Sequence, residues 1–250
     1  NGLSSETERR IQSLKPAHVY IIGGNAAVSA DVERRVTQLA ESGADIKRIA
    51  GDTRYDTSLK VASSVSNPSD TVIVTTGTNY ADALSISPYA FATGSPVVLS
   101  NPSSGLSDSA LKSIEDAGYK KAVIVGGASA VPALVTSQLK AQGIGSVVRL
   151  SGDTRYETSA KIVEFELAAN VGFTVDGALL ATGQNFPDAL AAGAVSGKRL
   201  TPLLLVDPGA QLACGFLSKY SGEVSRVTFV GGTSAIGDAE ATSITKALGI

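Results

Sequence analysis

Two short stretches of the chain place an arginine, a carboxylate and an aromatic ring at the same spacing. Gly-Asp-Thr-Arg-Tyr occurs at residues 51–55 and again at residues 152–156, each time after an apolar run and before a segment of helical character. An arginine can offer its planar fork to a carboxylate or a phosphate through two parallel hydrogen bonds. The candidate binding residues are therefore present in duplicate: Asp52, Arg54 and Tyr55, and Asp153, Arg155 and Tyr156.

A second duplicated motif follows each pentapeptide. Thr-Gly-x-Asn-aromatic-x-Asp-Ala-Leu covers residues 76–84 and residues 182–190, at the end of a strand-like apolar run. Its asparagine is suited to cap the helix that begins there, and its aspartate complements the helix dipole from the first turn. The asparagines and aspartates are Asn79, Asp82, Asn185 and Asp188.

The arginines have two interpretations. They are expected in the first turn of a helix, where the dipole disfavours a cation, so a compensating carboxylate is expected nearby. Asp82 and Asp188 are natural partners, and bidentate pairing would brace the fold. Alternatively, the arginines present positive charge to an anionic ligand. The tyrosines that follow them are read as packing residues or as platforms for sugars, and the aspartates before them as turn formers or members of the same network.

Composition limits the available chemistry. The chain has one histidine, His18, and one cysteine, Cys214, in 250 residues. These counts exclude a disulfide framework and Cys-rich or His-based metal clusters, and they disfavour a Ser-His-Asp centre. Neither a phosphate-binding loop nor a dinucleotide fingerprint is present, so no cofactor is expected. A net charge of −2 supplies no basic field for nucleic acid, and no apolar run is long enough for membrane insertion.

The motifs lie within a longer alternation of strands and helices. Three apolar runs end in Gly-Gly, at residues 19–24, 122–127 and 227–232. Continuous Val, Ile and Leu runs predict strands that are buried on both faces, and hence parallel sheets with helices on either side. The fold class is therefore α/β, as tandem flavodoxin-like or toprim-like modules. The glycines suit a tight turn with close helix packing or, alternatively, close backbone approach to an anion.

The repeat frame predicts three units of unequal completeness. Residues 1–45 are expected to be the back half of a first repeat, residues 46–146 a complete second repeat, and residues 147–250 a third repeat that lacks a final strand. A period of roughly one hundred residues is the size of a small domain. Because the chain begins within a repeat, we expect it to be a fragment of a larger protein.

The order of the motifs resembles a known family. R-x-x-G-D-T-R-Y-[DE]-T-S, then T-G-x-N-[FY]-[AP]-D-A-L, then a strand closed by Gly-Gly, is similar to the cell-wall-binding type 2 repeats of Gram-positive surface proteins over essentially the whole chain. The resemblance implies toprim-like modules, usually three in tandem with pseudo-threefold symmetry. It also implies a secreted, non-catalytic anchor that attaches a larger surface protein to an anionic cell-wall glycopolymer, while other domains carry the activity.

One departure from the family pattern and two other functions stay open. The chain has two and a half repeats rather than three, so a polymer groove between modules would be incomplete. The repeats could instead form a structural or adhesive array, or the strand-end glycines could belong to an α/β enzyme that acts on sugar phosphates or nucleotides. The missing catalytic histidine, the missing phosphate loops and the duplication itself argue against the enzyme.

Overall fold

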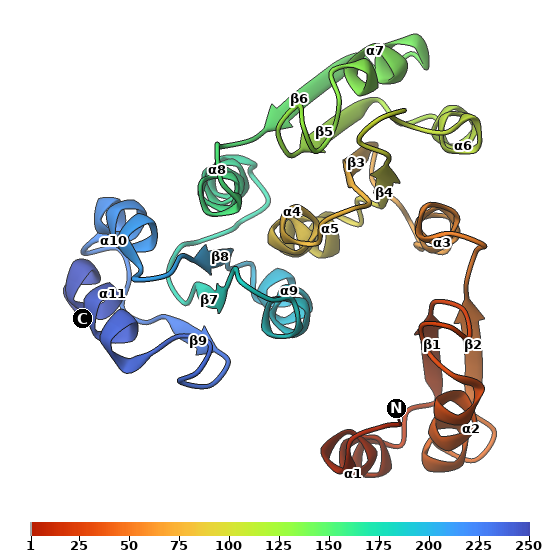
Figure 1. Cartoon of the computed structure of the whole chain (residues 1–250), viewed down its shortest axis with the longest axis horizontal. Coiled ribbons are helices and arrows are strands. Elements are labelled where there is room, and N and C mark those ends of the chain that lie inside the picture. Colours follow the sequence, from red (N-terminus) through yellow and green to blue (C-terminus); the bar gives the residue numbers. More distant parts are fainter. Residues whose placement is uncertain (1) are drawn as a thin grey trace. The chain divides into compact units, whose positions relative to one another are not determined.

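Three small parallel sheets, rather than one continuous sheet, organise the chain in a computed structural model that describes residues 2–250 (Figure 1). The strand orders are β1-β2, β4-β3-β5-β6 and β8-β7-β9, and every pair is parallel. The expectation of small parallel sheets flanked by helices is confirmed. One compact unit ends at Ser64, and a second begins at Val65.

The N-terminal unit is built on two strands. Ser29 starts the helix after β1 by accepting a hydrogen bond from the amide of Val32 at 3.4 Å. Arg35 of the same helix pairs with Glu8 of the first helix at 2.7 Å, which ties the two helices together. The elements are α1 (Ser5–Leu14), β1 (His18–Ile22), α2 (Ala30–Leu39), β2 (Asp45–Ile49) and α3 (Arg54–Ala62).

The second unit begins with a four-stranded sheet. Strand β3, which pairs with β4 on one side and β5 on the other, is buried along its whole length. Its continuous run of apolar residues and threonine is typical of a strand that lies between two helical layers. If the four strands are numbered along the chain, their spatial order in the sheet is 2-1-3-4, which is the start of the flavodoxin order. The elements are β3 (Thr71–Thr76), α4 (Ala81–Ser85), α5 (Ser87–Thr93), β4 (Val97–Ser100), α6 (Asp108–Ala117), β5 (Lys121–Val125), α7 (Leu134–Ala141) and β6 (Ser146–Leu150).

A three-stranded sheet completes the second unit. Alternate residues of its strands face opposite helical layers: Leu180 and Leu204 belong to one buried cluster, and Leu179 and Leu205 to another. The elements are α8 (Arg155–Ala168), β7 (Leu179–Thr182), α9 (Pro187–Arg199), β8 (Leu203–Val206), α10 (Gln211–Leu217), the 3-10 turn η1 (Ser218–Tyr220), β9 (Thr228–Val230) and α11 (Asp238–Leu248).

The two sheets of the second unit share helices. Ala81 and Leu84 of α4 lie in the cluster that covers β7 and β8, although α4 follows a strand of the other sheet. Conversely, Ile162 of α8 packs with Ile73 and Val123 of the four-stranded sheet. Neither sheet could bury its apolar surface fully without a helix from the neighbouring repeat, so the two modules form one core region.

The sheets and the sequence repeats are offset by one strand. The strand that opens each sequence repeat is hydrogen-bonded to the sheet before it: β2 pairs with β1, and β6 pairs with β5. The third sheet has no such fourth strand within residues 2–250. The sheet boundaries therefore differ from the boundaries of the predicted sequence repeats, which are 1–45, 46–146 and 147–250. The chain leaves one sheet and enters the next at the Gly-Asp-Thr-Arg-Tyr loops.

Candidate functional site

Much of the second pentapeptide builds a helix start. Thr154 accepts a hydrogen bond from the amide of Glu157 at 3.2 Å, and the Glu157 carboxylate accepts one from the amide of Thr154 at 3.2 Å. The amide of Gly152 donates to the Thr158 hydroxyl at 3.0 Å. A side chain on Gly152 would overlap the Cβ of Glu157, so this loop can approach the helix only with glycine.

The first pentapeptide has the same local structure. Thr53 and Asp56 form the capping box of α3, and the amide of Gly51 donates to the Thr57 hydroxyl at 2.9 Å. The same capping box is thus present in both copies. Asp52 and Arg54 are exposed, Tyr55 is half-buried, and Asp153 of the second copy is exposed as well.

Arg155 lies at the boundary between the two modules of the second unit. Its Nη1 donates to the carbonyl of Gly183 at 2.7 Å, and its guanidinium lies 5.8 Å from the centre of the Tyr80 ring. Within residues 2–250 no ion pair connects Arg155 to Asp82 or Asp188, so the expected bidentate Arg–Asp pair does not form. A backbone carbonyl at the end of β7 orients the arginine instead.

Asp82 and Asp188 lie against the double-glycine turns. One oxygen of Asp82 is 2.7 Å from the position that a Cβ on Gly126 would take, and one oxygen of Asp188 is 2.6 Å from the corresponding position on Gly231. The glycines thus permit close helix packing, which is one of the two roles that the sequence suggested. Burial raises the pKa of the Asp82 carboxyl, and the charge of Arg155 opposes that increase.

The asparagines differ between the copies. The N-cap residue of α4 is Tyr80 rather than Asn79, and Asn79 accepts a hydrogen bond from the amide of Ala81 at 3.1 Å. In the second copy Pro187 stands at the position of Ala81 and has no amide hydrogen to donate. Asn185 is exposed and makes no corresponding hydrogen bond, so the expected N-cap role is wrong by one residue in both copies.

Aromatic residues from the two copies meet at this boundary. The rings of Tyr80 and Phe186 lie 5.6 Å apart, and the Tyr80 hydroxyl donates to the carbonyl of Gln184 at 3.0 Å. Phe186 is 50% exposed, so the pair is open to solvent. We call Tyr80, Arg155, Asn185 and Phe186 the junction surface.

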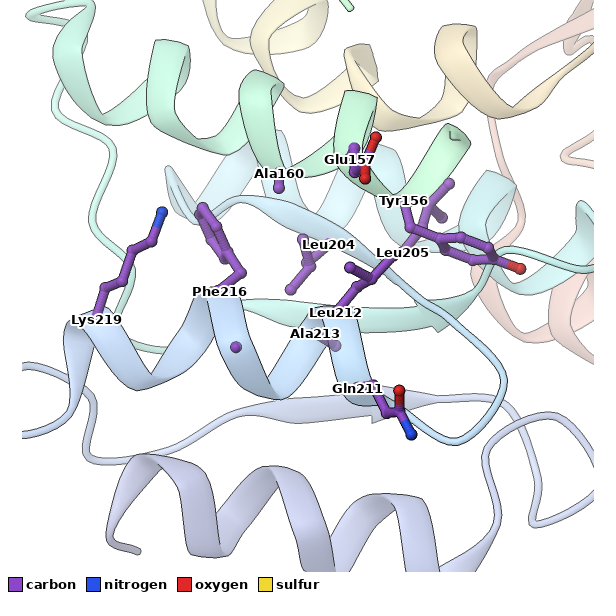
Figure 2. A pocket seen from close by; sticks show the side chains of 11 residues that line it. Tyr156, Glu157, Ala160, Leu204, Leu205, Gln211, Leu212, Ala213, Phe216 and Lys219 are labelled. Carbon is purple, nitrogen blue, oxygen red and sulfur yellow. The ribbon is translucent and has the colours of Figure 1, made fainter. Parts of the chain in front are cut away.

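A groove of about 240 Å³ lies next to Tyr156 (Figure 2). Leu204, Leu205 and Phe216 supply apolar walls between α8, β8 and α10, and Tyr156 and Lys219 lie at opposite ends of the labelled side chains. An apolar cleft with a few polar groups is the usual form of a small-molecule site. The sequence interpretation missed its polar members on α10 and η1, which lie in a segment without motifs: Gln211 and Lys219.

Metal-binding clusters and membrane-spanning helices are both absent from residues 2–250. That range contains no group of three or more His, Cys, Asp or Glu side chains placed to hold a metal ion. No helix in it combines the length and apolar character that a membrane crossing requires.

Solved structures share the fold. The chain is similar to Cwp8 from Clostridium difficile, with a TM-score of 0.81 and 24% identity over 99% of this chain and 41% of that one. It is also similar to Cwp6 from the same organism, with a TM-score of 0.71 and 22% identity over 79% of this chain and 31% of that one. At these identities the likeness concerns the fold.

Sequence comparison identifies the family. The amidase enhancer of Bacillus subtilis (strain 168) is 30% identical over 94% of this chain and 30% of its own length. The N-acetylmuramoyl-L-alanine amidase LytC of the same strain is 32% identical over 80% of this chain and 38% of its own length. The chain thus spans well under half of either curated relative. The profile of cell wall binding domain 2 matches residues 48–136 and 149–240. The chain therefore belongs to the cell wall binding domain 2 (CWB2) family of secreted, cell-wall-associated proteins.

Proposed function

We propose that the chain is a non-catalytic anchor that binds an anionic cell-wall glycopolymer through the junction surface and so holds a larger surface protein on the cell. The observation that carries the proposal is that motif residues of two repeats meet at one place. Tyr80 comes from the first copy of the Thr-Gly-x-Asn-aromatic-x-Asp-Ala-Leu motif, which we call the asparagine motif, and Phe186 comes from the second. Arg155 lies over the Tyr80 ring. A repeat protein that exposes its motif residues at a junction offers one composite surface to a ligand.

The side chains of the junction surface suit a charged polysaccharide. A sugar ring can pack its apolar face on an exposed aromatic ring such as Phe186, and Asn185 beside it carries an amide that both donates and accepts hydrogen bonds. The guanidinium of Arg155 has five N–H donors, of which the Gly183 carbonyl engages Nη1. Its other donors can bind the phosphate or carboxylate groups of an anionic polymer. Asp52, Arg54 and Tyr55 of the N-terminal unit are the counterparts of Asp153, Arg155 and Tyr156 in the second pentapeptide, and we propose them as a further contact.

A co-sedimentation assay with purified Gram-positive cell walls tests the anchor. We expect the chain to sediment with intact walls and to remain in solution with walls stripped of their anionic polymers. Binding should fall clearly between low salt and 1 M salt, where the Debye length is about 3 Å. Equal sedimentation with intact and stripped walls would show that the anionic polymer is not the ligand, and no sedimentation at all would favour a spacer or an enzyme.

Substitutions in the junction surface test which residues bind. Phe186→Ala should weaken wall binding several-fold with little change in the melting temperature, because half of the side chain is already exposed. Leu134→Ala is a matched control, since Leu134 of α7 is also 50% exposed and lies outside the motifs. Arg155→Lys keeps the charge and loses the planar fork. If Phe186→Ala and Arg155→Ala both bind walls normally, the junction surface is not the polymer site.

A further inference from the structure

The chain builds the same turn after β1, β5 and β9. In each case the first glycine of the pair has a positive φ, of 112° at Gly23, 118° at Gly126 and 119° at Gly231. The carbonyl of the second glycine then accepts hydrogen bonds from the amides three and four residues further on, in all three copies. The three double-glycine turns therefore have one backbone geometry.

Two of these turns bind a neighbouring strand through an arginine. The amide of Gly23 donates to Ile49 of β2 at 2.8 Å, and its carbonyl accepts from Nη1 of Arg48 at 2.6 Å. The amide of Gly126 likewise donates to Leu150 of β6 at 2.9 Å, and its carbonyl accepts from Nη1 of Arg149 at 2.7 Å. The first glycine of each turn thus exchanges two hydrogen bonds with the strand beside it.

The turn after β9 has no such neighbour within residues 2–250. There β9 pairs with β7 on one side, and no hydrogen bond connects Gly231 to another residue. Thr228 of β9 is exposed, and the rest of the strand is half-buried, whereas the corresponding residues of β5 are buried. An edge strand of this kind presents unpaired amides and carbonyls that another strand can bind.

We propose that the edge of β9 binds an extended peptide segment of the same sequence type as β2 and β6. Both strands are five residues long, with aliphatic residues in the second and fifth positions and arginine in the fourth, and in both the fifth residue is buried. The segment lies parallel to β9, and its arginine donates to the carbonyl of Gly231. Strand addition of this kind takes its affinity from backbone hydrogen bonds and its specificity from alternate side chains.

The register of the complex follows from the four-stranded sheet. There Val123 of β5 is opposite Val148, Ile124 opposite Arg149 and Val125 opposite Leu150. Val123 of β5 corresponds to Thr228 of β9, because each lies three residues before the first glycine of its double-glycine turn. A docked segment therefore places the residue before its arginine opposite Thr228, which is a position open to chemical cross-linking.

A synthetic peptide tests the proposal without wall polymer and thus independently of the anchor function. The probe is a fluorescent peptide with the sequence of residues 145–153, titrated into the intact chain and followed by anisotropy. We expect saturable binding that weakens at least tenfold when the peptide arginine is replaced by glutamine. Equal binding of the two peptides, or no binding, would overturn the proposal. A chain that dimerises in sedimentation velocity and excludes the peptide would overturn it too, because the occupant would then be a second copy.

Disulfide trapping tests the register. In a Cys214→Ser background, Thr228→Cys should form a disulfide with a peptide that carries cysteine at the position of Val148, because paired strands bring such Cα atoms within bridging distance. Thr242→Cys, at an exposed position of α11, is the matched control and should remain unlinked. Equal trapping at both positions would show non-specific contact and contradict the proposed register.

Discussion

Leu84 and Leu190 occupy the same position of the asparagine motif, in α4 and α9, but Leu84 is 8% exposed and Leu190 is 60% exposed. The difference comes from their neighbours. Leu84 packs into the cluster that covers β7 and β8, which belongs to the following module. Leu190 faces away from the buried clusters of the second unit. The motif therefore specifies a helix start in both copies, and contact with a second module decides whether its leucine contributes to stability.

Helix α9 also packs closely against α5, the helix that follows α4. A Cβ on Gly197 of α9 would lie 2.6 Å from the carbonyl oxygen of Pro88 and 2.8 Å from the Cβ of Phe91, both on α5. Phe91 and Gly197 occupy equivalent positions in the two repeats, at the same distance after Asn79 and Asn185. The aromatic residue of one repeat therefore packs against the glycine of the other. This contact joins the two modules, and predictions about it have the largest expected effects.

Gly197→Leu should give the largest loss of stability. The new side chain would push against backbone of α5, and overpacking of this kind costs about 3 kcal/mol in the free energy of unfolding. Urea unfolding followed by circular dichroism measures the loss. Gly215→Ala on α10 is the control, because no atom lies within 4 Å of its Cβ position and alanine favours a helix. An unchanged midpoint in Gly197→Leu would mean that α5 and α9 do not pack closely in solution.

Leu84→Ala and Leu190→Ala should differ sharply. Truncation of a buried leucine costs about 2 to 3 kcal/mol, whereas an exposed one changes the free energy of unfolding by less than about 0.5 kcal/mol. The same urea unfolding experiment compares the two variants. Equal losses would show that Leu190 is covered as well, and the comparison between the modules would fail.

Glu166 distinguishes the copies by its buried ionisable side chain. It is fully buried on α8, neither carboxylate oxygen has a well-formed hydrogen bond, and burial raises its pKa well above the ordinary value, which the amide of Tyr89 offsets only in part. At the same spacing after the first pentapeptide the chain has Val65. The folded state therefore keeps the proton to higher pH than the unfolded state does.

The stability of the second unit should consequently fall as the pH rises from about 4.3, the ordinary pKa of glutamate, through the raised pKa of Glu166. The slope for one such proton is at most about 1.4 kcal/mol per pH unit. Glu166→Gln should lack this slope, so the difference in unfolding free energy between wild type and variant should grow with pH and then level off. Parallel pH profiles would contradict a protonated Glu166.

The capping boxes should show the smallest effect and no difference between copies. Thr53→Ala and Thr154→Ala each remove one hydroxyl acceptor at a helix start, which costs about 1 kcal/mol. Amide hydrogen exchange in the first turns of α3 and α8 measures the loss separately for each copy. Because the cap is local, we expect similar values, and a large difference would mean that tertiary contacts govern these helix starts too.

Local structure could be read from the sequence because its causes are local. The apolar runs became parallel strands, and the helix expected at each pentapeptide begins there, with a capping box of Thr53 and Asp56 or of Thr154 and Glu157. The asparagines were misplaced by one residue, since the aromatic residue after each of them takes the N-cap position. The candidate ion pair of Arg155 with an aspartate failed for a different reason. Gly183 offers its carbonyl to Arg155 only after β7 and α8 have packed together.

By itself the sequence determined the strand and helix order, the helix starts, the double-glycine turns and the family, all of which depend on residue types within a few positions of one another. The tertiary structure alone decided that each Arg-bearing strand joins the preceding sheet and that Leu84 is buried while Leu190 is not. It also decided that Tyr80 meets Phe186. Copies of a repeat have nearly the same local interactions, but their burial depends on which module packs against them, and that is a property of the assembled chain rather than of the motif.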